Sequence, residues 1–467
     1  MPALLASALA VAVSASCGPP APERAPLSGA ASGYNVVVVS VDTLRADRLG
    51  AWGYQRHPTS PAIDRWVSRG ARFENASAPR AITWPSLATL LTGLYPSGHG
   101  LVFNGYSLAD GQPSLPLLLR AAGYETAAFL ANMCQANHQG WDRFECAGGV
   151  DRRVNRGALE WLRARSGDRP FLLWAHYFGP HPPYYNGGDL ARTRLDPGYQ
   201  GALTPKKGVL DRVMTEPVPL DDADRRHLDA LYDAAVIGTD RWVGELLDEV
   251  ERVAGLERTL VVLLADHGED LYQHNDYLYH ACSVYESSLH VPLAIVAPSL
   301  VPAATVSDLV EIVDLLPTIL ELLGLAAPSC QHGESLVPLL EAADGEKVAG
   351  APAGSTLTEY GGTEIHTYRE GDWKLITNPG GAAPVCMAGV PKDFYPIAER
   401  ELYDLAADPG EQRDLAAAHP EIVERLERAL AARRGGLCAG RPADRQQLDE
   451  ELRRQLEALG YVPEGGA

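Results

Sequence analysis

Five apolar runs rich in β-branched residues constrain the fold of this chain more than any other feature. They span residues 35–41, 126–130, 171–176, 259–265 and 292–297. Segments whose apolar residues recur three and four positions apart lie between them, for example at residues 228–250. Buried strands that alternate with amphipathic helices predict an α/β fold, with a large, mostly parallel sheet between layers of helices. Such sheets bind ligands at the carboxyl ends of their strands.

The chain has 467 residues, which is enough for one large domain and a smaller one. Its character changes after about residue 341, where a Gly/Ala-rich linker precedes short strand-like segments. Two helical stretches follow, at residues 420–433 and 443–459. We therefore predict a main domain at residues 34–345 and a small antiparallel α+β subdomain, with terminal helices, at residues 346–467.

The beginning of the chain resembles an export leader. Residues 1–16 are small and apolar, and a Pro-rich segment follows at residues 17–33, so we predict a signal peptide and a flexible tether. Cys17 follows Ser-Ala-Ser, which resembles a bacterial lipobox without its usual Leu. The prediction is an exported protein, either periplasmic or anchored to a membrane as a lipoprotein through Cys17.

The remaining cysteines are compatible with disulfides in an oxidising compartment. They are Cys134, Cys146, Cys282, Cys330, Cys386 and Cys438. Cys134 and Cys146 would close a short loop, and the other pairings stay open. No CxxC pair occurs, which argues against a zinc cluster built on thiolates.

The charge of the chain limits its partners. Its formal net charge is -20, and Lys and Arg are not concentrated anywhere, so a nucleic-acid partner is excluded. A small anionic substrate would require a local positive centre, such as a metal ion. The sequence does not indicate an oligomeric state.

Two of the apolar runs end in residues of the metal-binding type. Asp42 follows residues 35–41, and Asp266 with His267 follows residues 259–265. Asp42 alone could be a helix N-cap, but a second strand that ends in a carboxylate and an imidazole favours a metal site. This donor set suits Zn²⁺ or Mn²⁺, while Ca²⁺ and Mg²⁺ are less favoured because of the nitrogen.

Thr83 is the candidate nucleophile. It precedes Pro85, which we expect in the first turn of a helix, so the Thr83 hydroxyl should lie at a helix N-terminus. The free N–H groups there would suit a tetrahedral oxyanion. The alternative is an ordinary helix cap, and the metal ligands make the nucleophile the better interpretation.

Several histidines lie near these segments: His99, His176, His181, His274, His280 and His290. His181 follows residues 171–176 and is the first candidate for a protonated or donor role on a leaving group. His280 comes shortly after the Asp-His pair, so it could reach the same anion or a second metal. The functional interpretation is weaker for His99, His274 and His290.

A series of motifs in order along the chain resembles the sulfatase family of the alkaline phosphatase superfamily. The series is VVVVSVDTLRADRLGAWGY, TSPAIDRWVSRGARFENASAP, TWPSLATLLTGLYPSGHG, FLLWAHYFGPHPPY, LVVLLADHGEDLYQH, HACSVYESSLHVPL and ELYDLAADPGEQRDL. The resemblance implies an alkaline-phosphatase-like fold, with one divalent metal ion (Mn, Zn or Ca) and room for a second.

The resemblance also shows where this chain departs from the family. Sulfatases use a formylglycine made from the Cys or Ser of CxPSR, but this chain has Thr83 at that position and Leu87 in place of the Arg. Thr cannot become formylglycine. The usual Asp-Asp pair is Asp42-Thr43, and the usual Asp-Asn pair is Asp266-His267. These features are similar to relatives that use a Thr hydroxyl as metal ligand and attacking group.

The resemblance therefore implies covalent catalysis assisted by a metal. The metal ligands would be Asp42, Thr83, Asp266 and His267, and the catalytic residues Thr83, His181 and His280. The preferred substrates are phosphate diesters or phosphonates, because a hydroxyl nucleophile suits phosphorus and the formylglycine route is lost. A true sulfuric ester hydrolase, a phosphoglycerol-type transferase and a non-catalytic binding protein are the alternatives.

Overall fold

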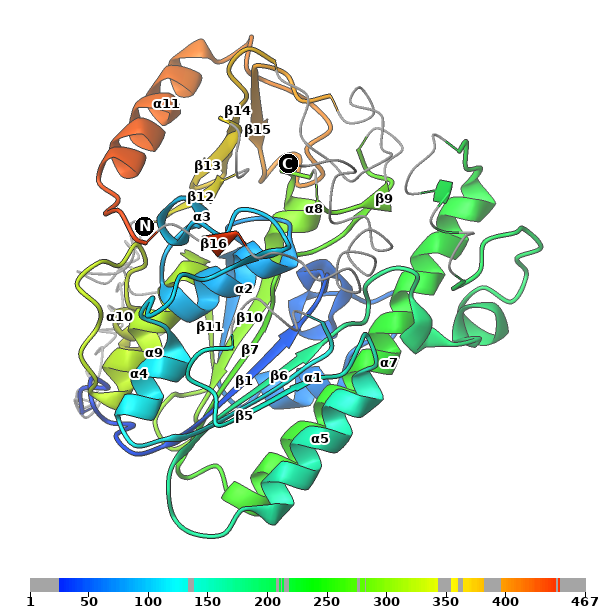
Figure 1. Cartoon of the computed structure of the whole chain (residues 1–467). Coiled ribbons are helices and arrows are strands. Elements are labelled where there is room, and N and C mark those ends of the chain that lie inside the picture. Colours follow the sequence, from blue (N-terminus) through cyan, green and yellow to red (C-terminus); the bar gives the residue numbers. More distant parts are fainter. Residues whose placement is uncertain are drawn as a thin grey trace, which may run out of the picture.

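A computed structural model describes residues 25–132, 138–206, 210, 212–213, 218–274, 278–281, 283–342, 354–359, 364–381, 396–441 and 444–445. Its centre is an eight-stranded sheet with the order β11-β2-β10-β7-β1-β6-β4-β5 (Figure 1). In that order the strands are Ala304–Glu311, Ala71–Ser77, His290–Val296, Thr259–Ala265, Asn35–Val41, Phe171–Tyr177, Glu125–Leu130 and Arg143–Cys146. The pairs are parallel except for the two that β10 makes with β2 and β7. The predicted mostly parallel sheet is therefore present.

Helices cover both faces of this sheet (Figure 1). One layer contains α1 (Pro61–Val67), α5 (Asp151–Ala164) and α7 (Asp222–Ala254). The other contains α2 (Thr83–Thr92), α4 (Leu115–Ala121), α9 (Leu315–Leu323) and α10 (Val337–Glu341). Every residue of β6 and β7 is buried, as expected for strands between two helical layers. No helix of the described part of the chain is long and apolar enough to span a membrane.

A smaller antiparallel sheet follows the main one. Its strands are β12 (Ser355–Glu359), β13 (His366–Glu370), β14 (Trp373–Thr377) and β15 (Arg400–Asp404), and α11 (Pro420–Gly435) covers it. Leu357, Leu375, Leu402 and Leu426 form its core, together with Tyr95 from the main domain. The predicted boundary near residue 345 lies outside the described residues.

Two predictions about the ends of the chain need correction. Asp444–Arg445 form β16, which pairs with β3 (Tyr106–Ser107), so these residues do not begin the helix predicted at 443–459. Leu27 and Ala31 are buried, and Gly29 N–H donates to the Glu321 carbonyl of α9 at 2.8 Å. This part of the predicted flexible tether, residues 17–33, is therefore fixed to the main domain. The predicted signal and Cys17 lie outside the described residues.

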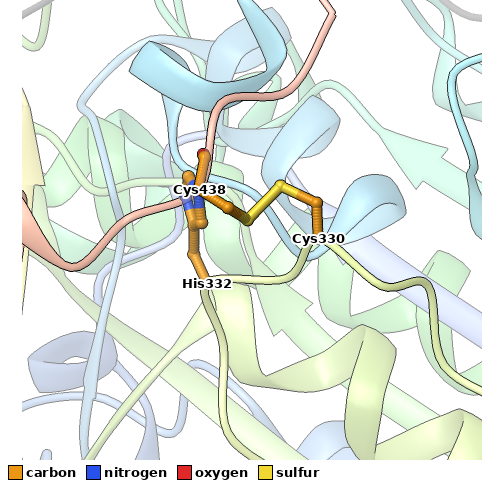
Figure 2. Close-up of side chains that lie close together, drawn as sticks. All are labelled: Cys330, His332 and Cys438. Atoms are coloured by element: carbon orange, nitrogen blue, oxygen red, sulfur yellow. A yellow bond between two sulfur atoms is a disulfide. The ribbon is translucent and has the colours of Figure 1, made fainter.

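A disulfide joins Cys330, after α9, to Cys438, after α11 (Figure 2). His332 lies beside it, with Nδ1 accepting from Tyr95 N–H at 3.0 Å and Nε2 donating to the Cys438 carbonyl at 2.8 Å. Because both sulfur atoms and both ring nitrogens are occupied, this group is not a metal centre. Cys146 is also in a disulfide, and Cys134, its predicted partner, lies outside the described residues.

Cys438→Ser should destabilise the protein without changing its active site. The bridge closes a loop with a sequence separation of 108, and disulfides typically stabilise a protein by about 2–4 kcal/mol through restriction of the unfolded chain, with more for longer loops. We expect a lower urea midpoint in the variant. Cys330→Ser should give the same loss, and unequal losses from the two variants would contradict the paired role.

Candidate active site

The site begins at the carboxyl ends of two neighbouring strands. In the β1–β7 register Val41 lies opposite Ala265, so Asp42 and Asp266 leave the sheet side by side. Thr43 N–H donates to Asp266 Oδ1 at 3.2 Å, which joins the two strand ends. Thr43 has a φ of 57°, a conformation that costs energy for a β-branched residue. The turn that places Asp42 is thus strained.

Two buried carboxylate oxygens lie close to an imidazole nitrogen here. Asp42 Oδ1 and Asp266 Oδ2 are buried and have no hydrogen-bond partner, and His267 Nε2 is 3.6 Å from each of them. His267 Nδ1 lies 2.9 Å from the Gly268 carbonyl, which only accepts, so Nδ1 carries the proton and Nε2 the lone pair. Buried lone pairs without donors are unfavourable, and a divalent cation between them fits this donor set.

The electrostatics of the two carboxylates agree with this interpretation. Burial, followed by the nearby Asp266 charge, raises the pKa of Asp42 well above its usual value. Burial also raises the pKa of Asp266. Without a cation, therefore, the folded protein favours protonation of these groups.

Thr83 lies where the sequence predicts, as the first residue of α2. Its Oγ1 is 3.5 Å from His267 Nε2, so the hydroxyl lies next to the candidate metal-ligand atoms. Ser86 Oγ donates to the Asp266 carbonyl at 2.6 Å and ties the first turn of α2 to the end of β7. Leu87 is fully buried in the main core, where an unpaired charge would be costly.

The structure brings His181 and His280 to this site. The His280 ring centroid lies 4.5 Å from that of His267 and 5.1 Å from that of His181. Burial lowers the pKa of His181 to about 3 and that of His280 well below its usual value, so both rings are neutral at pH 7. Of the protonated or donor role expected for His181 from the sequence, the protonated form is thus not favoured in the free protein. An anion bound beside it would raise this pKa.

Three other histidines have structural contacts elsewhere. His99 Nδ1 accepts from Leu101 N–H at 3.1 Å, and its Nε2 lies 3.1 Å from Thr89 Oγ1 in α2. His274 pairs with Asp270 at 2.8 Å, and His290 donates to the Glu74 carbonyl at 2.7 Å. These contacts agree with the weaker functional interpretation of these three histidines from the sequence.

Three further residues of the site received no functional role from the sequence. Asn132 follows β4 and donates to Asp42 Oδ2 at 2.8 Å. Glu269 accepts from His280 Nδ1 at 3.3 Å. His176, near the end of β6, lies within 4.8 Å of Asp42 and Asp266, measured between ligand atoms. Asn132 and His176 follow the same strand-end rule as Asp42, which could have revealed both.

Comparison with known proteins decides the family. The family model described as Sulfatase matches residues 34–325. The chain belongs to the sulfatase family. It is 28% identical to arylsulfatase K of Xenopus laevis, over 85% of this chain and 81% of that protein. It is 24% identical to the N-acetylglucosamine-6-O-sulfatase of Bacteroides thetaiotaomicron, over 84% of this chain and 85% of that protein.

Solved structures confirm the predicted alkaline-phosphatase-like fold. A protein in complex with its substrate D-glucosamine-2-N,6-O-disulfate superposes with a TM-score of 0.68 at 21% identity, covering 86% of this chain and 98% of that one. The phosphonate monoester hydrolase of Agrobacterium radiobacter superposes with a TM-score of 0.66 at 20% identity, covering 86% of this chain and 95% of that one. The chain is thus a sulfatase-family hydrolase acting on ester bonds.

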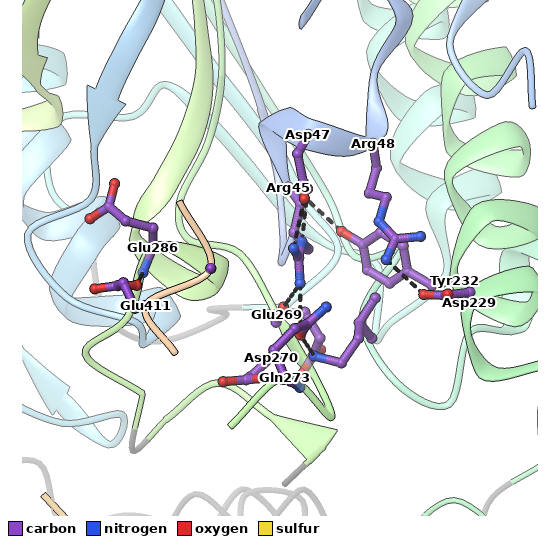
Figure 3. Close-up of polar contacts among 12 residues, drawn as sticks. Arg45, Asp47, Arg48, Asp229, Tyr232, Glu269, Asp270, Gln273, Glu286 and Glu411 are labelled. Carbon is purple, nitrogen blue, oxygen red and sulfur yellow. Dashed lines mark hydrogen bonds and ion pairs between the residues drawn. The ribbon is translucent and has the colours of Figure 1, made fainter. Parts of the chain in front are cut away.

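A buried arginine fixes the loops of this sulfatase-family site. Arg45 pairs with Asp47 at 2.7 Å and donates to the Glu269 carbonyl at 2.8 Å (Figure 3). Its main-chain N–H donates to Tyr232 Oη, which donates to the Thr43 carbonyl at 2.6 Å. The loop after β1 is therefore attached both to the loop after β7 and to α7.

The smaller sheet also contacts the segments on both sides of α2, the helix that begins at Thr83. Glu359, at the end of β12, donates its main-chain N–H to the Pro79 carbonyl at 3.1 Å, just before α2. Its carboxylate accepts from Ser97 N–H at 2.7 Å and from Ser97 Oγ at 2.8 Å, just after α2. One residue of the C-terminal subdomain thus holds the segments on both sides of the helix that begins at Thr83.

Glu359→Ala should therefore lower kcat by about tenfold, with little change in KM, because small displacements of a reacting group are costly. Steady-state kinetics on the folded variant measures this. Glu364→Ala removes an exposed carboxylate from the same segment and should leave kcat within about twofold. Equal kcat values for Glu359→Ala and the wild type would rule out the positioning role.

Proposed function

We propose that this protein is a metal-dependent sulfuric ester hydrolase with Thr83 as its nucleophile. The observation that carries the proposal is the position of Thr83 Oγ1, at the start of α2 and 3.5 Å from His267 Nε2, beside the unpartnered oxygens of Asp42 and Asp266. The sulfate-ester class is supported by the relatives, which are named arylsulfatase and N-acetylglucosamine-6-O-sulfatase. A small sulfated sugar is therefore the proposed substrate.

The metal site is proposed from the donor set. Asp42, Asp266 and His267 would hold the ion together with the Thr83 hydroxyl. Their oxygen and nitrogen donors favour Zn²⁺ or Mn²⁺ over Ca²⁺. When bound, such an ion would lower the pKa of a hydroxyl and offset negative charge on a substrate oxygen.

The residues of the chain then have distinct tasks. Thr83 would release its hydroxyl proton to solvent, and its Oγ1 would form a bond to sulfur while the bond from sulfur to the leaving oxygen breaks. Water would then attack sulfur and break the bond between sulfur and Thr83 Oγ1, which releases sulfate and restores the hydroxyl. Trp84 N–H donates to Asn104 Oδ1 at 3.0 Å and Ser86 N–H donates to the Ile82 carbonyl at 3.2 Å, so the dipole of α2, and not these two groups, would stabilise negative charge on the sulfuryl oxygens. His181 lies next to His280 and would give a proton to the leaving oxygen once the bound anion has raised its pKa.

A second candidate is the cleavage of phosphate diesters or phosphonates. The specific observation for it is Thr83 itself, because a Thr cannot be converted to the formylglycine of typical sulfatases. The structural likeness to phosphonate monoester hydrolases supports this candidate.

A substrate panel separates the candidates. The purified protein, loaded with Zn²⁺ or Mn²⁺, is offered 4-nitrophenyl sulfate, N-acetylglucosamine 6-sulfate, bis-4-nitrophenyl phosphate and a phenylphosphonate monoester. We expect the highest kcat/KM for a sulfate ester. A higher kcat/KM for the diester or phosphonate would favour the second candidate. Binding of these anions without turnover of any would favour a non-catalytic protein.

We also propose that the protein is exported and that Cys17 carries a lipid anchor. The leader-like residues 1–16 and the lipobox-like sequence before Cys17 support this. The Cys330–Cys438 disulfide agrees with folding in an oxidising compartment. Labelling with a radioactive fatty acid, which should be lost in Cys17→Ser, tests the anchor.

A further inference from the structure

His176 approaches the proposed metal site from a third strand. It lies near the carboxyl end of β6, opposite Ser40 of β1, and its side chain is fully buried. One of its ring nitrogens lies within 4.8 Å of carboxylate oxygens of Asp42 and Asp266. Since β1 lies between β6 and β7, His176 and Asp266 flank Asp42 from its two sides.

The two nitrogens of His176 have different surroundings. Nδ1 is 2.9 Å from Ser40 Oγ, which accepts a hydrogen bond from Trp174 Nε1 at 2.9 Å. Nε2 is buried without a partner. When Nδ1 donates to Ser40 Oγ, the lone pair is on Nε2.

The two carboxylates near His176 also have oxygen atoms without partners. Asp42 Oδ1 and Asp266 Oδ2 are buried and accept no hydrogen bond, so a third unshared pair beside them is unfavourable. A cation among the three atoms gives each of them a partner.

We propose that His176 is a further ligand of the metal ion, binding it through Nε2. The inference rests on the proposed metal dependence but not on the class of ester. With His267 it gives the ion two imidazole ligands, in addition to carboxylates and a hydroxyl. Two nitrogen donors strengthen the preference for Zn²⁺, Mn²⁺ or Co²⁺ over Ca²⁺, which binds oxygen almost exclusively. The Ser40 contact would orient the ring, as partners of metal-bound histidines commonly do.

Paramagnetic NMR of the Co²⁺-loaded wild-type protein tests this ligand directly. Each metal-bound imidazole with a protonated Nδ1 gives one strongly shifted, exchangeable N–H signal. Labelling the histidines with ¹⁵N assigns these signals to imidazole. We expect two signals, one from His267 and one from His176. His176→Gln should leave one and weaken Zn²⁺ binding by about 10- to 100-fold, as measured by titration calorimetry. Ca²⁺ binding should change by less than about threefold.

The matched control is His99→Gln, which replaces another fully buried histidine whose ring contacts Thr89 and Leu101. It should keep both signals. A single signal in the Co²⁺-loaded wild type would overturn the role of His176 and leave the proposed function intact. Failure of the wild type to bind Co²⁺ or Zn²⁺ would overturn the metal dependence and this inference with it. If His176→Gln does not fold, the number of signals in the wild type still decides.

Discussion

Thr83→Ala is expected to lower kcat/KM by about 10³- to 10⁶-fold, the range found when a covalent nucleophile is removed. The hydroxyl lies at the N-terminus of α2, 3.5 Å from His267 Nε2, and the side chain is buried. Loss of the hydroxyl removes the attacking atom but leaves the carboxylates and the helix in place. Steady-state kinetics on the best substrate of the panel measures the effect.

Thr83→Ser is the matched control, because it keeps a hydroxyl at the same position. It should retain activity at least about a hundredfold above Thr83→Ala. Both variants should unfold within a few degrees of the wild type, since Thr83→Ser removes only a methyl group and Thr83→Ala only a methyl group and a hydroxyl. If Thr83→Ala turned over at the wild-type rate, Thr83 would have no part in the chemistry.

Removal of the metal should abolish turnover and destabilise the protein, with a larger loss of stability at higher pH. In the metal-free protein burial raises the pKa values of Asp42 and Asp266. Such a carboxyl group contributes stability below its unfolded value of about 4 and loses it as the pH rises through the raised value. A bound ion replaces the protons and stabilises by about 2.7 kcal/mol at a hundredfold excess over Kd.

Thermal unfolding with Zn²⁺ or with a chelator, from about pH 5 to about pH 8, tests this linkage. The difference in Tm between the two conditions should widen as the pH rises. Asp266→Asn should remove most of the difference and lower kcat by about 10³-fold or more. Asp240→Asn is the control: Asp240 is a buried carboxylate that caps Ala62 and Ile63 N–H. This variant should keep the difference, and a constant difference in the wild type would contradict the linkage.

The sequence predicted the centre of the site because the centre follows from topology. Residues after adjacent parallel strands must lie together, and this rule places Asp42 beside Asp266 and His267. The position of Thr83 at a helix N-terminus was predicted because Pro85 marks the first turn of the helix. The same rule applied to β4 and β6 would have added Asn132 and His176.

Other features depend on contacts between distant segments. The neutral state of His181 results from complete burial beside other rings, which a Pro-rich loop does not reveal. The Glu359 contacts join segments separated by more than 250 residues. β16 forms because residues 444–445 meet β3, and this pairing overrides the helical pattern of the local sequence.

The most direct test of the central claim is mass spectrometry of the peptide that contains Thr83, from enzyme quenched in acid during turnover of a sulfate ester. The account predicts one sulfo group on that peptide, located at Thr83 by fragmentation and absent without metal. A burst of released alcohol with an unmodified Thr83 peptide, or with the group on another residue, would contradict it.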